Sequence, residues 1–137
     1  MKLIRKNWIE VVENTLSNVI DPDFILIFGS YAKGSERVGS DLDIAYFSHN
    51  KLSDYDRFLI AQQLAEQLKT EVDLVNIKTI DTVFAAQIFF TGKLISCKDR
   101  NEFNKQRMKA LSMYVTLNEQ RKKIIEQVDE RGYIYEE

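Results

Sequence analysis

Two aspartates separated by one residue, Asp41 and Asp43, stand in the stretch DLDIAYF, which has the alternating pattern of a β-strand. Residues i and i+2 of a strand point to the same face, about 7 Å apart. Two ionised carboxylates placed so would repel each other, and partial burial would raise the pKa of one. Mg²⁺ would turn this repulsion into attraction, because it binds one or two carboxylates and keeps other positions for water and phosphate oxygens. The pair therefore predicts a magnesium site.

A third aspartate, Asp73, lies in the apolar stretch EVDLVNI, which also has the composition of a strand. An acid among such neighbours needs a specific role. If this strand lies beside residues 41–47, Asp73 faces the same site. Three carboxylates could then hold one or two cations, with Asp73 as a ligand or as the base for an attacking hydroxyl.

A Gly-Ser pair, Gly29 and Ser30, follows the apolar run FILIF that ends at Phe28. Glycine permits a sharp turn and a close approach of the backbone to another group. Ser30 can begin a short helix whose free N–H groups, together with its hydroxyl, would bind an anion. Lys33 is placed to act as a further phosphate partner. This region thus offers both phosphate donors and metal-binding carboxylates.

The elements that must position these residues follow from hydrophobic periodicity and turn signals. Pro22 ends the first helix, and Gly92 is expected to be the C-cap of another. Helices are predicted over 3–20, 30–33, 53–68, 80–91 and 99–130, and strands over 24–28, 41–47, 71–77 and, at an edge, 93–97. The last helix is unusually long, so we expect it to be broken or to extend along a partner. The order predicts a small α/β domain with a mixed sheet.

Composition narrows the class of protein. The chain has 137 residues, 45% hydrophobic and 29% charged, with a net charge of −2. These values suit one globular domain over 1–137, with a core at about 20–98 and a helical extension at about 99–131. They give no sign of a disordered or nucleic-acid-coating protein. A single cysteine excludes an internal disulfide, and with no apolar span or leader we expect a cytoplasmic protein that binds neither membrane nor nucleic acid.

The combination of Gly29-Ser30, Asp41-Leu42-Asp43 and Asp73 resembles the three-part signature of the DNA polymerase β-like nucleotidyltransferase superfamily. Ser40, which precedes the Asp pair, also resembles the family pattern. The small size is similar to the minimal nucleotidyltransferase (MNT) branch, whose members are commonly antitoxins paired with HEPN-domain ribonuclease toxins.

The resemblance implies a reaction of ATP and Mg²⁺. Asp41, Asp43 and Asp73 would be the catalytic and metal-binding residues, and Gly29 and Ser30, with Lys33 and Ser40, would bind the nucleotide. In the antitoxin branch, AMP is transferred to a tyrosine of the cognate HEPN toxin, which silences it. Two alternatives stay open: a small-molecule nucleotidyltransferase, such as an antibiotic-modifying enzyme, and an antitoxin that acts by binding alone.

Several other residues receive simpler interpretations. His49, the only histidine, is expected to be a solvated loop residue, and the single cysteine, Cys97, a small core residue at a strand end. Phe89 and Phe90 are expected to pack in the core, with an adenine pocket as the alternative. The C-terminal tyrosines 133 and 135 are expected to lie in a frayed end.

Overall fold

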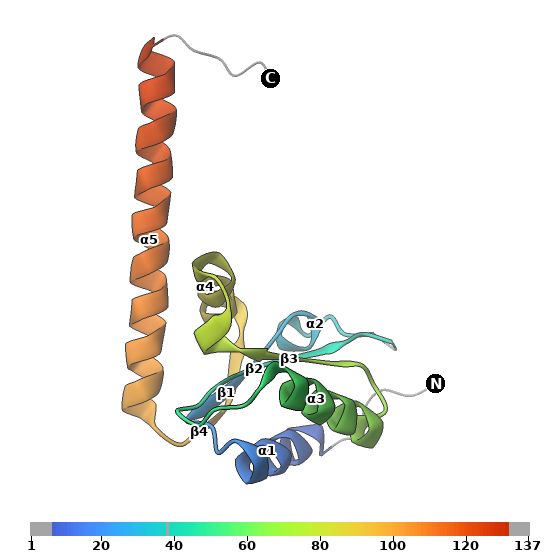
Figure 1. The fold of residues 1–137 in the computed structure, drawn as a ribbon. Coiled ribbons are helices and arrows are strands. Elements are labelled where there is room, and N and C mark those ends of the chain that lie inside the picture. The colour runs from blue at the N-terminus through green and yellow to red at the C-terminus, as the bar shows by residue number, and fades with distance from the viewer. Residues whose placement is uncertain (1–6, 38, 132–137) are drawn as a thin grey trace.

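A four-stranded mixed sheet forms the centre of the computed structural model, which describes residues 7–37 and 39–131 (Figure 1). The strands lie in the order β3-β2-β1-β4. Their bounds are β1 Phe24–Phe28, β2 Leu42–Phe47, β3 Val72–Asn76 and β4 Lys93–Cys97. β1 pairs with both β2 and β4 in antiparallel fashion, whereas β2 and β3 are parallel. The predicted mixed sheet and the expected edge position of 93–97 are confirmed.

The helices connect these strands in the predicted order. They are α1 Trp8–Val19, α2 Ser30–Lys33, α3 Asp54–Leu68, the 3₁₀ turn η1 Ile77–Thr79, α4 Thr82–Thr91 and α5 Arg100–Arg131. Ser53 and Asp81 begin α3 and α4 as N-caps, because their side chains accept hydrogen bonds from the backbone N–H groups of Asp56 and Phe84. α3 joins two parallel strands, a connection that needs a crossover element of this kind.

The two faces of the sheet carry different helices. One face packs against α1, α2 and α3 through a cluster that includes Leu16, Ile44 and Leu64. The other packs against α4 and the start of α5, where Phe24 contacts the ring of Phe103 at 5.0 Å between centroids. β1 and β2 are therefore buried on both sides, which explains their nearly continuous apolar runs.

The start of the first helix differs from the sequence-based expectation. The first helix begins at Trp8, and residues 3–6 of its predicted range lie outside the described part of the chain. Gly92 is the C-cap of α4, as predicted, with a φ of −80°. A Cβ there would lie 2.8 Å from the backbone oxygen of Ile27 in β1, so tight packing explains this glycine.

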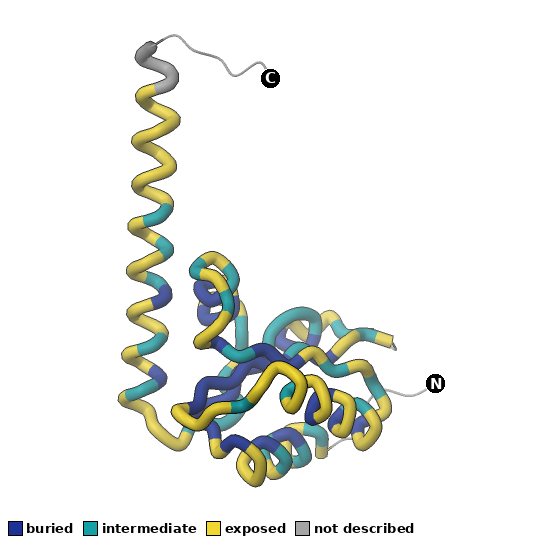
Figure 2. Tube along the Cα trace, in the orientation of Figure 1, coloured by how far each residue is buried: buried dark blue, intermediate teal, exposed yellow. Residues whose placement is uncertain are grey.

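The last helix, α5, is continuous over 32 residues, or about 48 Å. Figures 1 and 2 show its first part beside α4 and its distal part projecting away from the sheet with an exposed surface. Phe103 near its start is buried, whereas Ile125 in its distal part is exposed. The break considered from its length is not present. The tail tyrosines, Tyr133 and Tyr135, lie outside the described residues.

Among the helices that the structure describes, none combines the length and apolar character needed to cross a lipid bilayer.

Candidate active site

The parallel pairing of β2 and β3 brings two of the predicted aspartates together. Asp43 stands directly opposite Asp73 in the register, and Phe28 of β1 stands opposite Asp43 on its other side. Paired residues on neighbouring strands project to the same face of a sheet, here the face that α4 and α5 cover. The expectation that the strand of Asp73 lies beside residues 41–47 is therefore confirmed.

Asp43 is the electrostatically strained member of the group. Its side chain is half-buried, and its pKa is raised from 3.8 to about 6. Burial is the main cause, followed by the negative charges of Asp73 and Asp41. A carboxylate with this environment favours a bound proton or a bound cation over the bare anion. The donor set, three carboxylates at one strand end, is one that fits a hard cation such as Mg²⁺.

Gly29 supplies the close approach that Asp43 needs. Its φ is +74°, in the region that favours glycine, and a Cβ on it would collide with the Oδ2 atom of Asp43 and lie 3.2 Å from Cγ. Any other side chain would push the Asp43 carboxylate away. The Gly-Ser turn and the aspartate pair are thus in direct contact across the β1–β2 ladder, as their spacing had suggested.

Ser30 opens α2, the short helix that was predicted over the same residues. The helix is anchored by Tyr31 and Ala32, both buried, and the ring of Trp8 packs edge-on against Tyr31 at 5.8 Å. Gly34 ends the helix in the left-handed conformation. This anchoring fixes the position of Gly29 and Ser30 relative to β2.

Two predicted nucleotide-binding residues lie farther along the connection to β2. Lys33 is exposed in the last turn of α2. Ser40 holds a turn, because its Oγ accepts the backbone N–H of Arg37 at 2.8 Å and its backbone oxygen accepts the hydroxyl of Thr70 at 2.9 Å. The Ser40 hydroxyl therefore has a local structural partner, and contact of either residue with a nucleotide stays a prediction.

Asp41 and Asp73 are both exposed, in contrast to Asp43. Asp41 immediately precedes β2 rather than lying in it. Asp73 borders a hollow of about 310 Å³ at the open edge of the sheet, which Arg57 and Phe58 of α3 also line. A hollow of about 480 Å³ lies between α4, α5 and η1, and none of the three aspartates lines it. The candidate active site is therefore placed at the aspartates, because their carboxylates can bind a metal ion.

Phe89 and Phe90 were both expected in the core, but only Phe89 is buried there, and neither lines the hollow that Asp73 borders. Phe89 is buried in the core, as expected, with its ring 5.8 Å from that of Phe103. Phe90 is exposed and contacts Tyr114 of α5, with 6.3 Å between ring centroids.

A second group of ionisable side chains escaped the sequence reasoning. His49 lies close to Asp23 and Glu102, at the opposite end of β1 and β2 from the aspartates. The three residues come from separate parts of the chain, so no local spacing pattern marks them. His49 is exposed, as expected of a loop residue, but the structure gives it two carboxylate neighbours.

Comparison with known proteins agrees with the fold. The family model for polymerase beta, nucleotidyltransferase, matches residues 10–101. The protein adenylyltransferase MntA of Shewanella oneidensis is 32% identical over 121 residues, which span 87% of this chain and 85% of the relative.

Solved structures extend the similarity to three dimensions. A crystal structure of a toxin–antitoxin with AMP-PNP superposes with a TM-score of 0.78 at 31% identity, covering 88% of this chain and 97% of the matched chain. A structure of the tri-AMPylated Shewanella oneidensis HEPN toxin in complex with MNT antitoxin gives 0.71 at 30% identity, covering 89% and 95%. The chain therefore belongs to the polymerase β nucleotidyltransferase family and is a homologue of the protein adenylyltransferase MntA.

Proposed function

We propose that this protein is the antitoxin of a toxin–antitoxin pair and a Mg²⁺-dependent protein adenylyltransferase. It transfers AMP from ATP to a tyrosine of a cognate HEPN ribonuclease toxin and thereby neutralises the toxin. The observation that carries the proposal is the placement of Asp43 opposite Asp73, against Gly29, in a chain similar to MntA over most of its length.

The three aspartates have distinct places in the proposed reaction. Asp41 and Asp43 would hold the metal ion, with Asp73 as the third carboxylate. Bound Mg²⁺ supplies neutralisation of phosphate charge and orientation of the triphosphate. The partly buried Asp43 has a raised pKa, so ionised Asp43 offers a strong site for a cation. Exposed Asp73 is accessible to an incoming hydroxyl and suits a role as the acceptor of its proton.

The proposed transfer of AMP forms one bond to phosphorus and breaks one. The tyrosine oxygen attacks the α-phosphorus of ATP, the new P–O bond forms, and the bond to the β-phosphate oxygen breaks with release of pyrophosphate. Gly29 leaves room for the backbone and the Asp43 carboxylate to meet, and the Ser30 hydroxyl beside them would donate to the phosphates. Ordering these groups before reaction supplies much of the acceleration in phosphoryl transfer.

Neutralisation follows from charge. An adenylate on a tyrosine near the ribonuclease site adds bulk and a negative phosphate where RNA phosphate would bind, and like charges repel. The structure of the tri-AMPylated Shewanella oneidensis HEPN toxin with its MNT antitoxin is an example of a toxin modified in this way.

The test is a transfer assay with the cognate HEPN protein, ATP labelled in its α-phosphate, and Mg²⁺. We expect label on a tyrosine of the toxin, no label when Mg²⁺ is chelated, and loss of label with the double variant D41N/D43N. Transfer to an antibiotic in the absence of any protein acceptor would support the small-molecule alternative instead. Full neutralisation of the toxin by D41N/D43N would support action by binding alone.

A further inference from the structure

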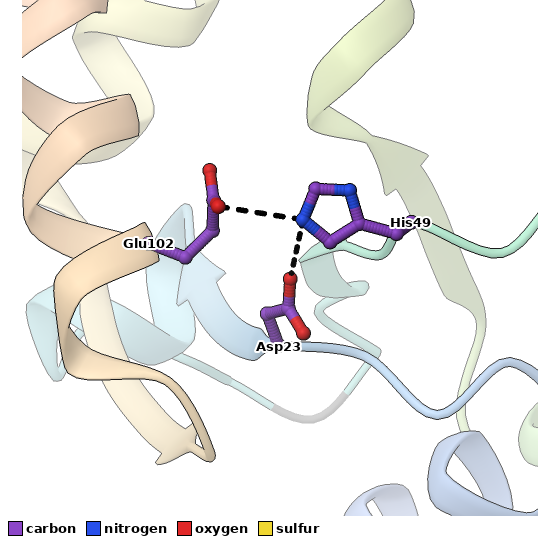
Figure 3. A group of neighbouring side chains, drawn as sticks. All are labelled: Asp23, His49 and Glu102. Atoms are coloured by element: carbon purple, nitrogen blue, oxygen red, sulfur yellow. Dashed lines mark hydrogen bonds and ion pairs between the residues drawn. The ribbon is translucent and has the colours of Figure 1, made fainter.

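The Nε2 atom of His49 faces two carboxylates from distant parts of the chain (Figure 3). It lies 3.1 Å from Oδ2 of Asp23 and 3.3 Å from Oε1 of Glu102. The three ligand atoms are all within 4.8 Å of one another. In a tetrahedral zinc site with bonds of 2.0–2.1 Å, neighbouring ligand atoms are about 3.3 Å apart. The distances from Nε2 of His49 to the two carboxylate oxygens match this spacing.

Asp23 provides the observation that points to a bound ligand. Only 7% of the residue is exposed, and its buried Oδ2 atom receives no hydrogen bond from any described residue. The distance to His49 Nε2 would permit a bond, but the geometry does not make one. A buried carboxylate oxygen without a donor is unfavourable unless a cation or proton satisfies it. Oδ2 lies 3.1 Å from Nε2 of His49, whereas Nζ of Lys98 lies 3.9 Å from the other oxygen, Oδ1.

Glu102 is oriented toward the same point by a neighbour on α5. Gln106 donates from Nε2 to Oε2 of Glu102 at 2.6 Å, which leaves Oε1 for His49. Outer partners that orient carboxylate and imidazole ligands are a usual feature of metal sites.

The backbone around the cluster is fixed by hydrogen bonds. The Asp23 N–H donates to the oxygen of Phe47, and its own oxygen accepts the N–H groups of Lys98 and Asp99 just before α5. The ring of Phe47 packs edge-on against His49 at 5.4 Å. The loop after β2, the residue before β1 and the first turn of α5 therefore meet at one rigid point.

We propose that Asp23, His49 and Glu102 form a site for a divalent transition-metal ion such as Zn²⁺, separate from the aspartates of the active site. An imidazole nitrogen with two carboxylates suits Zn²⁺ better than Mg²⁺, which prefers oxygen ligands alone. The ion would fasten the first turn of α5 to the sheet and leave one position for water. It is independent of the proposed transfer of AMP.

The active-site aspartates would also attract Zn²⁺. The site at His49 is therefore tested in a variant that lacks two of these aspartates. In the untagged D41N/D43N background, calorimetric titration with Zn²⁺ should find one site, and Zn²⁺ should raise the melting temperature. Adding H49A should weaken binding by about tenfold or more and abolish the melting shift. Q106A, which removes only the orienting partner, should weaken binding less. His49 is exposed and is the only histidine, so H49A should still fold, and ring resonances in NMR report on one residue.

X-ray absorption of the zinc-loaded protein should show nitrogen and oxygen neighbours and no sulfur. Equal Zn²⁺ affinity with and without H49A, or sulfur scattering from Cys97, would overturn the proposal. Absence of Zn²⁺ binding would also overturn the proposal. If H49A then destabilised the protein only at acidic pH, His49 would be a protonated residue held by two carboxylates without a metal ion.

Discussion

Gly29 and Gly34 have the same φ of +74° but entirely different surroundings. A Cβ on Gly29 would meet the carboxylate of Asp43, whereas a Cβ on Gly34 has no atom within 4 Å. The two positions therefore separate the energy of an unfavourable backbone conformation from the effect of displacing a candidate metal ligand.

We predict that G29A abolishes AMP transfer and that G34A does not. G34A should lower the free energy of unfolding by about 1 kcal/mol, because only the left-handed backbone is strained. G29A adds a collision that moves Asp43, so transfer should fall by about 100-fold or more. Rates of toxin labelling and denaturant unfolding of both variants provide the check. Equal activity in the two variants would contradict the assigned contact.

The charge of Asp43 predicts a pH dependence of stability in the absence of divalent cations. The folded-state pKa of about 6 lies above the ordinary value of 3.8, so the folded protein binds this proton more tightly than the unfolded chain. The resulting destabilisation is fully present above pH 6 and disappears as the pH falls toward 3.8. Mg²⁺ should offset it at neutral pH and have less effect at pH 5.

We therefore expect D43N to raise the unfolding free energy in EDTA at pH 7.5, by on the order of 1 kcal/mol after allowance for partial solvent exposure. At pH 4 the gain should vanish. D41N, which removes the same charge from an exposed position, should give a smaller gain. Urea unfolding at the two pH values measures both. A loss of stability in D43N at pH 7.5 would mean that burial does not strain this carboxylate.

At the scale of elements, the α3 crossover decides the site. It returns the chain to run β3 parallel to β2, with Asp73 opposite Asp43. A slip of one residue would turn Asp73 to the other face, where Val72 and Leu74 now pack with α1 and α3. The apolar neighbours of Asp73 thus fix its register, and the aspartate itself contributes function.

We predict that D73N lowers the rate of AMP transfer by about 100-fold or more while leaving the unfolding free energy within about 0.5 kcal/mol. E71Q is the matched control, because Glu71 is an exposed acid two residues away, just before β3. E71Q should keep near-full activity. Similar losses in both variants would show that general negative charge, and not the position of Asp73, supports the reaction.

At the scale of the whole molecule, α5 has two parts with different roles. Its first turns pack through Phe103 and Ala110 into the core, whereas Ile124 and Ile125 are 59% and 61% exposed. Within the distal turns, residues 121–127 are all exposed and bury almost nothing against the rest of the domain. Their apolar side chains do not contribute to folding of the isolated chain.

Removal of residues 121–137 should therefore change the unfolding free energy by less than about 0.5 kcal/mol. F103A, at the packed end of the same helix, should cost about 3–5 kcal/mol, because Phe103 contacts the rings of Phe24 and Phe89. Denaturant unfolding of the two variants checks this division. A large loss on truncation would show that the distal helix is needed for the fold.

The sequence by itself determined the order of elements and the candidate active site. Turn residues, N-caps and periodicity are local, so Ser53 predicted the start of α3 correctly. Asp41, Asp43 and Gly29 belong to one short segment, and an acid within an apolar strand is conspicuous in Asp73. The burial of these strands and the unpaired charge of the aspartates within them could therefore be inferred from the sequence.

Tertiary structure alone decided the rest. Phe58 is an apolar residue of the helix predicted over 53–68, yet it is 56% exposed, because only contact with the sheet sets which face of the helix is buried. The same limit explains why α5 could not be recognised as one projecting helix. His49 appeared to be an isolated polar residue, and its meeting with Asp23 and Glu102 depends on three segments brought together only by the packed sheet and α5. Contacts between distant segments leave no local pattern, because they arise from packing geometry.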